Sequence, residues 1–179
     1  MFSSQKGQTL IEVVAVSGII TMSLVVILSL GVASISFSAH NKEEIIASNL
    51  AREGIESIRI IRDRSWLNNR PAFSELPDGN FIVDPAKGIF SASEVISAVN
   101  ADSAVIDSCG NCAIYLNQIG DGNIYSHNSI INNPKITPYK RLIKIITDGN
   151  KKKITSQVFW NSKGKMHYFN LDAYLTDWR

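Results

Sequence analysis

The chain has 179 residues, of which 45 % are hydrophobic, and a formal net charge of +2 at pH 7. This length suits one domain plus an anchoring segment rather than two large domains, and so small a net charge gives no indication of a nucleic-acid partner. Charged residues are sparse near the N-terminus and ordinary later, so the mean hydropathy near zero averages an apolar segment and a polar domain.

The apolar segment covers Gly7–Phe37, and no Asp, Glu, Lys or Arg occurs between Glu12 and Lys42. That interval of about 29 residues would form roughly 43 Å of helix, more than the roughly 30 Å needed to span the hydrocarbon core of a bilayer. A cleavable secretory signal with a cut near Ser36–Ala39 is the alternative. Its apolar region would be shorter, about 7 to 15 residues, and we therefore expect a membrane-spanning helix.

The residues at the start of this segment resemble the signal of type IV pilins and type II secretion pseudopilins. A short leader with a cation, Lys6, precedes Gly7, and Gln8-Thr9-Leu10-Ile11-Glu12 leads into the apolar helix. The resemblance implies that a prepilin peptidase cuts between Gly7 and Gln8, that Gln8 is then N-methylated, and that Glu12 is the acidic residue used in assembly. In this chain Gln8 stands where Phe or Met is more usual, and Ser29 and Gly31 stand where the family helix has a proline.

The spacing of Gln8 and Glu12 has its own chemical meaning. The two residues are four apart and share one helix face. After cleavage Gln8 would carry a positive α-amino group, and an unpaired Glu12 would be costly in a medium of low dielectric constant. We expect Glu12 to pair with the amino terminus of a neighbouring subunit; the alternative is a boundary carboxylate that reaches water in the headgroup layer.

The helical pattern continues beyond the apolar segment. From Asn41 to Trp66 there is no proline and a single glycine, Gly54, and apolar residues recur at helical spacing. The charged residues on the other sides, Glu56 and Arg59 among them, are expected to form a solvated face. The sequence therefore predicts one helix from about Thr9 to about Trp66.

The segment after the helix is predicted to be rich in loops up to residue 135. Two short strands are expected within it, Phe81–Val83 and Ala113–Leu116, together with a short helix over Ser93–Val99. Asn117–Asn123 is expected to be an ordinary turn, with a calcium site as the alternative because the loop offers several oxygen ligands.

Three strands with clear alternation follow. They are expected at Leu142–Thr147, Lys153–Trp160 and Met166–Leu171, with turns at Asp148–Asn150 and Asn161–Gly164. Lys151, Lys152 and Lys153 fall at the first hairpin tip, where a solvated turn and protection of the sheet edge are expected and a DNA contact is the alternative. An antiparallel meander of this kind can cover the apolar stripe of the helix.

The two cysteines are Cys109 and Cys112. A disulfide is expected, because the domain should face an oxidising exterior. The alternatives are a thioredoxin-like site, which lacks its βαβ context, a zinc site, which needs further ligands such as His40, His127 or His167, and a pair of free thiols.

Taken together, these patterns predict an α+β, pilin-like chain: a leader over 1–7, a membrane and assembly helix over 8–40, its soluble continuation over 41–67 and a β domain over 68–179. The resemblance implies a filament subunit whose partners are the prepilin peptidase, sister subunits, the inner-membrane assembly platform and membrane lipid. No catalytic set, cofactor or nucleic-acid partner is expected. The alternative functions are a single-pass anchored binding domain that never polymerises, and an anchored enzyme.

Overall fold

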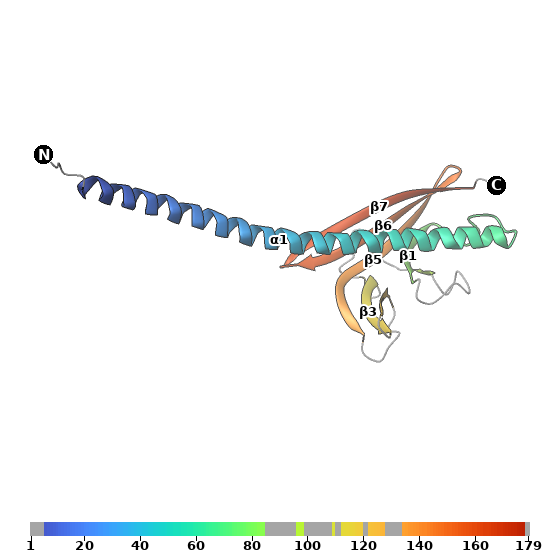
Figure 1. Ribbon diagram of the computed structural model, residues 1–179. Helices are drawn as coiled ribbons and strands as arrows, with labels where there is room; N and C mark the ends of the chain where they lie inside the picture. The colour runs from blue at the N-terminus through green and yellow to red at the C-terminus, as the bar shows by residue number, and fades with distance from the viewer. Residues whose placement is uncertain are drawn as a thin grey trace. The chain divides into compact units, whose positions relative to one another are not determined.

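The computed structural model describes residues 6–84, 96–98, 109, 112–119, 122–127 and 134–177; the side chains of 6–9, 96–98 and 119 are outside that description. The chain divides into two compact units, Met1–Glu43 and Glu44–Arg179. A long apolar N-terminal helix and a C-terminal antiparallel sheet make up the fold, which is of the α+β type (Figure 1).

Helix α1 runs over Lys6–Leu67, close to the predicted bounds. It ends because the chain turns into the left-handed region at Asn69, whose φ is 54°. The backbone N–H of Asn69 donates to the carbonyl of Trp66 at 2.9 Å, which satisfies a carbonyl of the last turn. Pro71 then prevents the helix from resuming.

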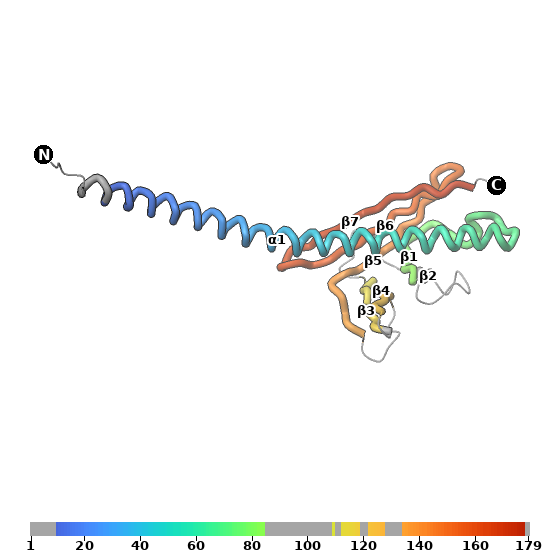
Figure 2. The backbone as a smooth tube through the Cα atoms, viewed as in Figure 1, coloured from blue at the N-terminus to red at the C-terminus, as the bar shows by residue number. Residues whose placement is uncertain are grey.

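The sheet has seven strands, and β5 lies at its centre. The strands are β1 (Gly79–Val83), β2 (Ile96–Ala98), β3 (Ala113–Ile119), β4 (Gly122–Ser126), β5 (Lys135–Asp148), β6 (Lys151–Ser162) and β7 (Lys165–Thr176). On one edge β5 pairs with β6, which in turn pairs with β7; on the other edge β5 pairs with β3 near its start and with β1 near its end. Figure 2 shows β2 beside β1 and β4 beside β3.

The predicted meander of three strands is confirmed, and each strand is longer than the sequence suggested. Strands β5, β6 and β7 have 14, 12 and 12 residues and are joined by tight turns. In the second turn Lys163 and Gly164 have φ values of 51° and 78°, the conformation that matches the twist of a two-residue hairpin.

The loop-rich segment contributes four strands, more than predicted. The short helix expected over Ser93–Val99 is wrong, because Ile96–Ala98 forms β2 and pairs with Val83–Phe81 of β1. The other residues of that predicted helix lie outside the described part of the chain. A three-residue strand has too few positions to show a period of two, and its pairing partner is remote in sequence.

The core lies between the second half of α1 and one face of the sheet. Two adjoining clusters of buried side chains fill this layer. Their members on α1 are Ala47, Leu50, Ala51, Ile55, Ile58 and Ile61, and those on the sheet include Phe81, Val83, Ile114, Tyr139, Ile143, Ile145, Ile154, Val158, Trp160 and Leu175.

Gly54 marks the place where α1 comes closest to the sheet. A Cβ atom at this position would lie 2.6 Å from Cδ1 of Ile143 and 2.9 Å from Oγ of Ser156. Both distances are below van der Waals contact, so only glycine fits without a shift of the sheet side chains.

Candidate functional site

Among the described residues, the largest exposed apolar surface lies on the N-terminal part of α1. From Leu10 to Phe37 its large apolar side chains are all exposed, typically by one half to three quarters of their surface. By length and composition this helix could cross a membrane, although signal sequences near an N-terminus share that property. A surface of this size on a water-soluble protein would mark an interaction site.

Four hydroxyl side chains inside the apolar segment are hydrogen-bonded within the helix itself. The hydroxyl of Ser17 donates to the carbonyl of Val14 at 2.9 Å, and that of Ser23 donates to Ile19 at 2.8 Å. Thr21 and Ser29 do the same with the carbonyls of Gly18 and Val26. These hydroxyls therefore need no water, and they can enter lipid without leaving a free donor.

The three residues of the predicted processing and assembly signal all lie in the first turns of α1. Lys6 is the first helical residue, so the bond between Gly7 and Gln8 lies in the opening turn, where backbone N–H groups have no partner within the helix. Glu12 follows one turn after Gln8 and its side chain is exposed.

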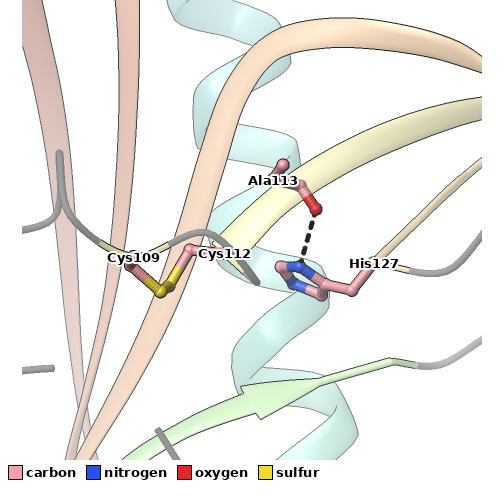
Figure 3. Close-up of a disulfide and its surroundings, with 4 residues drawn as sticks. All are labelled: Cys109, Cys112, Ala113 and His127. Atoms are coloured by element: carbon pink, nitrogen blue, oxygen red, sulfur yellow. Dashed lines mark hydrogen bonds between the residues drawn. A yellow bond between two sulfur atoms is a disulfide. The ribbon is translucent and has the colours of Figure 1, made fainter. Parts of the chain in front are cut away.

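Cys109 and Cys112 form a disulfide with a Cα–Cα distance of 5.4 Å (Figure 3). Both residues are buried and pack against Leu142 of β5, with Phe159 of β6 partly covering them. Leu142 points away from α1, because its neighbours Arg141 and Ile143 face the core on the other side. The disulfide thus closes a small apolar cluster on the outer face of the sheet.

His127 lies close to Ala113, the residue that follows Cys112. Its Nδ1 is 3.1 Å from the carbonyl oxygen of Ala113, the first residue of β3 (Figure 3). A carbonyl can only accept, so Nδ1 must carry the proton and donate. The bond ties the residue after β4 to the start of β3 and identifies a structural role for this histidine.

Asn117–Asn123, expected to be an ordinary turn with a calcium site as the alternative, is mostly strand in its described residues. Asn117 belongs to β3 and is buried, and its Nδ2 donates to Oγ of Ser126 at 3.0 Å. Gly122 and Asn123 belong to β4, and the two residues between the strands lie outside the described chain. Among the described residues no group of three His, Cys, Asp or Glu side chains is placed to hold a metal ion.

One charged group in the domain is fully enclosed, and sequence reasoning missed it. The side chain of Arg141 in β5 is 1 % exposed. Its Nη1 donates to the carbonyl of Leu50 at 2.9 Å and to Oε2 of Glu53 at 3.1 Å, and its Nη2 donates to the carbonyl of Val83 at 2.7 Å. Burial lowers the pKa of Arg141, and the nearby Glu53 carboxylate opposes that shift. The guanidinium therefore joins α1, β1 and β5.

The lysine run at the first hairpin tip is only partly solvated. Lys152 is 11 % exposed on its side chain, and its Nζ donates to Asp78 at 2.6 Å and to Thr147 at 2.7 Å. The hydrogen bond from Lys152, together with those that the hydroxyl and backbone N–H of Thr147 donate to the same carboxylate, lowers the pKa of Asp78 to about 2. Lys153 pairs with Asp172 of β7 at 2.9 Å. The expectation of a fully solvated turn is therefore wrong for Lys152.

No protein-family model, characterised protein or solved structure matches this chain at a significant level. The assignment of function thus depends on the residues and on the geometry given above.

Proposed function

We propose that the chain is a structural subunit of a type IV pilus or a type II secretion pseudopilus, cut after Gly7, N-methylated at Gln8 and polymerised through α1. The observation that carries this proposal is an exposed apolar helix, Leu10–Phe37, with a single carboxylate, Glu12, at its beginning. Lipid covers this surface before assembly, and the helices of sister subunits cover it afterwards.

Because these serine and threonine hydroxyls are hydrogen-bonded within their own helix, they are compatible both with lipid and with the core of a filament. A hydroxyl that is bonded to its own helix costs little in lipid. It also leaves a short side chain, so two helices can approach closely where Ser17, Gly18 and Ser29 occur. The same sequence can therefore move from a bilayer into a helical filament core without exposing a new polar group.

In this proposal Glu12 fixes the position of each helix along the helix of the neighbouring subunit. A charged carboxylate in the middle of a bilayer costs about 3 kcal/mol on insertion scales, and pairing with a cation removes much of that cost. The α-amino group at Gln8 of a neighbouring subunit becomes available once the leader is removed. The opening turn of a helix frays readily, and this would give the peptidase access to the bond after Gly7.

The surroundings of the β domain follow from the same proposal. The disulfide between Cys109 and Cys112 favours an oxidising compartment outside the cytoplasm for residues 68–179. The membrane partners would be the prepilin peptidase and the inner-membrane assembly platform. The role is mechanical rather than catalytic.

Two measurements on protein purified from its native cells test the proposal. Mass spectrometry of the N-terminal peptide should find a mature chain that begins at Gln8 and carries one methyl group. Replacing Glu12 by Ala should reduce incorporation into filaments by about a hundredfold, the equivalent of about 3 kcal/mol. Glu44→Ala removes an exposed carboxylate beyond the apolar segment and should leave incorporation unchanged.

The proposal fails if the mature protein still begins at Met1, or if it has lost the apolar segment up to about Ala39. The second candidate, an anchored binding domain that does not polymerise, predicts that Glu12→Ala and Glu44→Ala behave alike. An anchored enzyme would require a pocket with converging polar groups in the β domain.

A further inference from the structure

Strand β7 forms the longest open edge of the sheet. It has 12 residues and, among the described residues, pairs only with β6. The pairing with β6 runs without a register shift from Lys165 opposite Ser162 to Thr176 opposite Lys151. The backbone groups on the other side of β7 therefore form a continuous row without strand partners.

The remaining open edges are short, as is usual for soluble sheets. Strand β2 has three residues, and β4 has five and begins with Gly122 and Asn123. Natural sheets protect longer edges with proline, a bulge or a charge that points inward. Strand β7 has neither a proline nor a bulge, and after Lys165 at its start the side chains on its core side are His167, Phe169, Leu171, Ala173 and Leu175. An edge of this kind is suited to strand addition by another polypeptide.

The side chains of β7 indicate which kind of strand could be added at this edge. Phe169, Leu171 and Ala173 pack on the core but are only partly buried, so an added strand would complete the apolar layer. On the outer face Met166, Tyr168 and Tyr174 are 48 %, 71 % and 55 % exposed. An extended segment with apolar side chains on at least one face fits both surfaces.

The charged side chains near this edge indicate which kind of partner segment it would bind. The hairpin formed by β6 and β7, residues 151–176, contains five lysines and one acid, Asp172, a net charge of +4. Lys153 neutralises Asp172, which leaves the exposed Lys163 and Lys165 at one end of the edge. At the other end the exposed Lys151 lies opposite Asp148, and Asp177 follows Thr176. The positive charge is therefore concentrated at the Lys163 and Lys165 end, which would attract a segment with acidic residues at the facing end.

We propose that the outer edge of β7 is a docking site for an extended segment of a partner protein, with acidic residues at the end that faces Lys163 and Lys165, which adds to the sheet as an antiparallel strand. The ladder of backbone hydrogen bonds supplies the affinity, and these two lysines select for acid. The proposal does not depend on cleavage after Gly7 or on polymerisation through α1.

The experiment uses the full chain in detergent micelles and a labelled peptide of about ten alternating valine and threonine residues with two glutamates at each end. Fluorescence anisotropy should show saturable binding. A peptide of the same sequence with alternate backbone nitrogens methylated should bind at least tenfold more weakly, because it cannot complete the ladder. Hydrogen exchange should slow at amides within 165–176 when the unmodified peptide binds.

Protein variants separate the edge from general attraction between a basic protein and an acidic peptide. Lys165→Glu should weaken binding about threefold to tenfold, the size expected for surface charges. Lys135→Glu is the matched control: it reverses an exposed lysine on β5, opposite Leu116 of β3, and should leave binding unchanged.

Three results would overturn the proposal: equal binding of the methylated peptide, exchange protection confined to residues outside 165–176, or no binding of any peptide. A single-stranded oligonucleotide that protects β7 where the peptides do not would assign this basic surface to nucleic acid instead.

Discussion

Replacement of Arg141 tests how the helix is fixed on the sheet. The guanidinium places one nitrogen against α1, at Leu50 and Glu53, and the other against β1, at Val83. Lysine carries its three N–H donors on one nitrogen, which cannot occupy the positions of both Nη1 beside α1 and Nη2 beside β1. Methionine fills a similar volume without a charge. We predict that Arg141→Lys destabilises the β domain more than Arg141→Met does.

The magnitudes follow from burial and from the bonds that are lost. Arg141→Lys keeps a buried cation, which is more strongly hydrated in water, and breaks charged hydrogen bonds worth about 1.5–3 kcal/mol each, so we expect a loss of about 3–5 kcal/mol. Arg141→Met leaves the carbonyls of Leu50 and Val83 without this donor, a cost of about 1–3 kcal/mol. Glu53 loses its cation but is 36 % exposed and can be hydrated, and the change also removes the desolvation of the buried cation. The net loss for methionine should be about 0–2 kcal/mol.

Urea unfolding of the full chain in detergent micelles measures the difference through tryptophan fluorescence, to which the buried Trp66 and Trp160 contribute. With a slope of about 2 kcal/mol per molar urea, the midpoint of Arg141→Lys should fall about 0.5–2.5 M below that of Arg141→Met. Arg59→Met, which removes an exposed ion pair with Glu56, should change stability by less than about 1 kcal/mol. A lysine variant as stable as the methionine variant would refute the reasoning.

Three further predictions concern single contacts in the β domain. Gly54→Val should destabilise it by about 3 kcal/mol in urea unfolding, because the new side chain overlaps Ile143 and Ser156, whereas Gly31→Val has open space and should not. Asp78 has a folded pKa of about 2, below its value of 3.8 in the absence of its partners, so its contribution is present above about pH 4 and is lost as the pH falls towards 2. The stability difference between the native chain and Asp78→Asn should therefore shrink over that interval, and a difference that stays constant from pH 5 to pH 2 would contradict the assignment. Replacing Cys109 and Cys112 together by Ala should cost only about 2 kcal/mol, because the closed loop is very short, and a loss of cooperative unfolding would show that the disulfide does more.

The elements with a sustained period were predictable from the sequence. Apolar spacing and the absence of proline marked α1, and alternation with turn residues marked β5, β6 and β7. The strand bounds were too short in each case, because polar residues such as Lys151 and Asn161 stay in the ladder and because core residues such as Tyr139 and Leu175 lie outside the alternating stretches. Where packing alone decides the conformation, as in β2, there was no local signal.

The site could be predicted only in its local part. Gly7, Gln8 and Glu12 stand close together in sequence, so their spacing carries information. Arg141 had no such signal, because its enclosure depends on Leu50, Glu53 and Val83, which are remote along the chain. Gly54 gave a partial indication as the one glycine in an otherwise helical stretch, and its meaning became clear only with Ile143 opposite.

The position of β5 has a consequence for how such a chain can evolve. One edge of β5 holds the hairpin of β6 and β7, and the other holds β1 and β3 in succession. Insertions or substitutions within residues 85–134 therefore change only the part of the sheet that pairs with one edge of β5. They leave the half formed by β5, β6 and β7 intact. Under selection to vary the exposed surface, the sequence of that segment could change repeatedly while β5, β6 and β7 keep their structure.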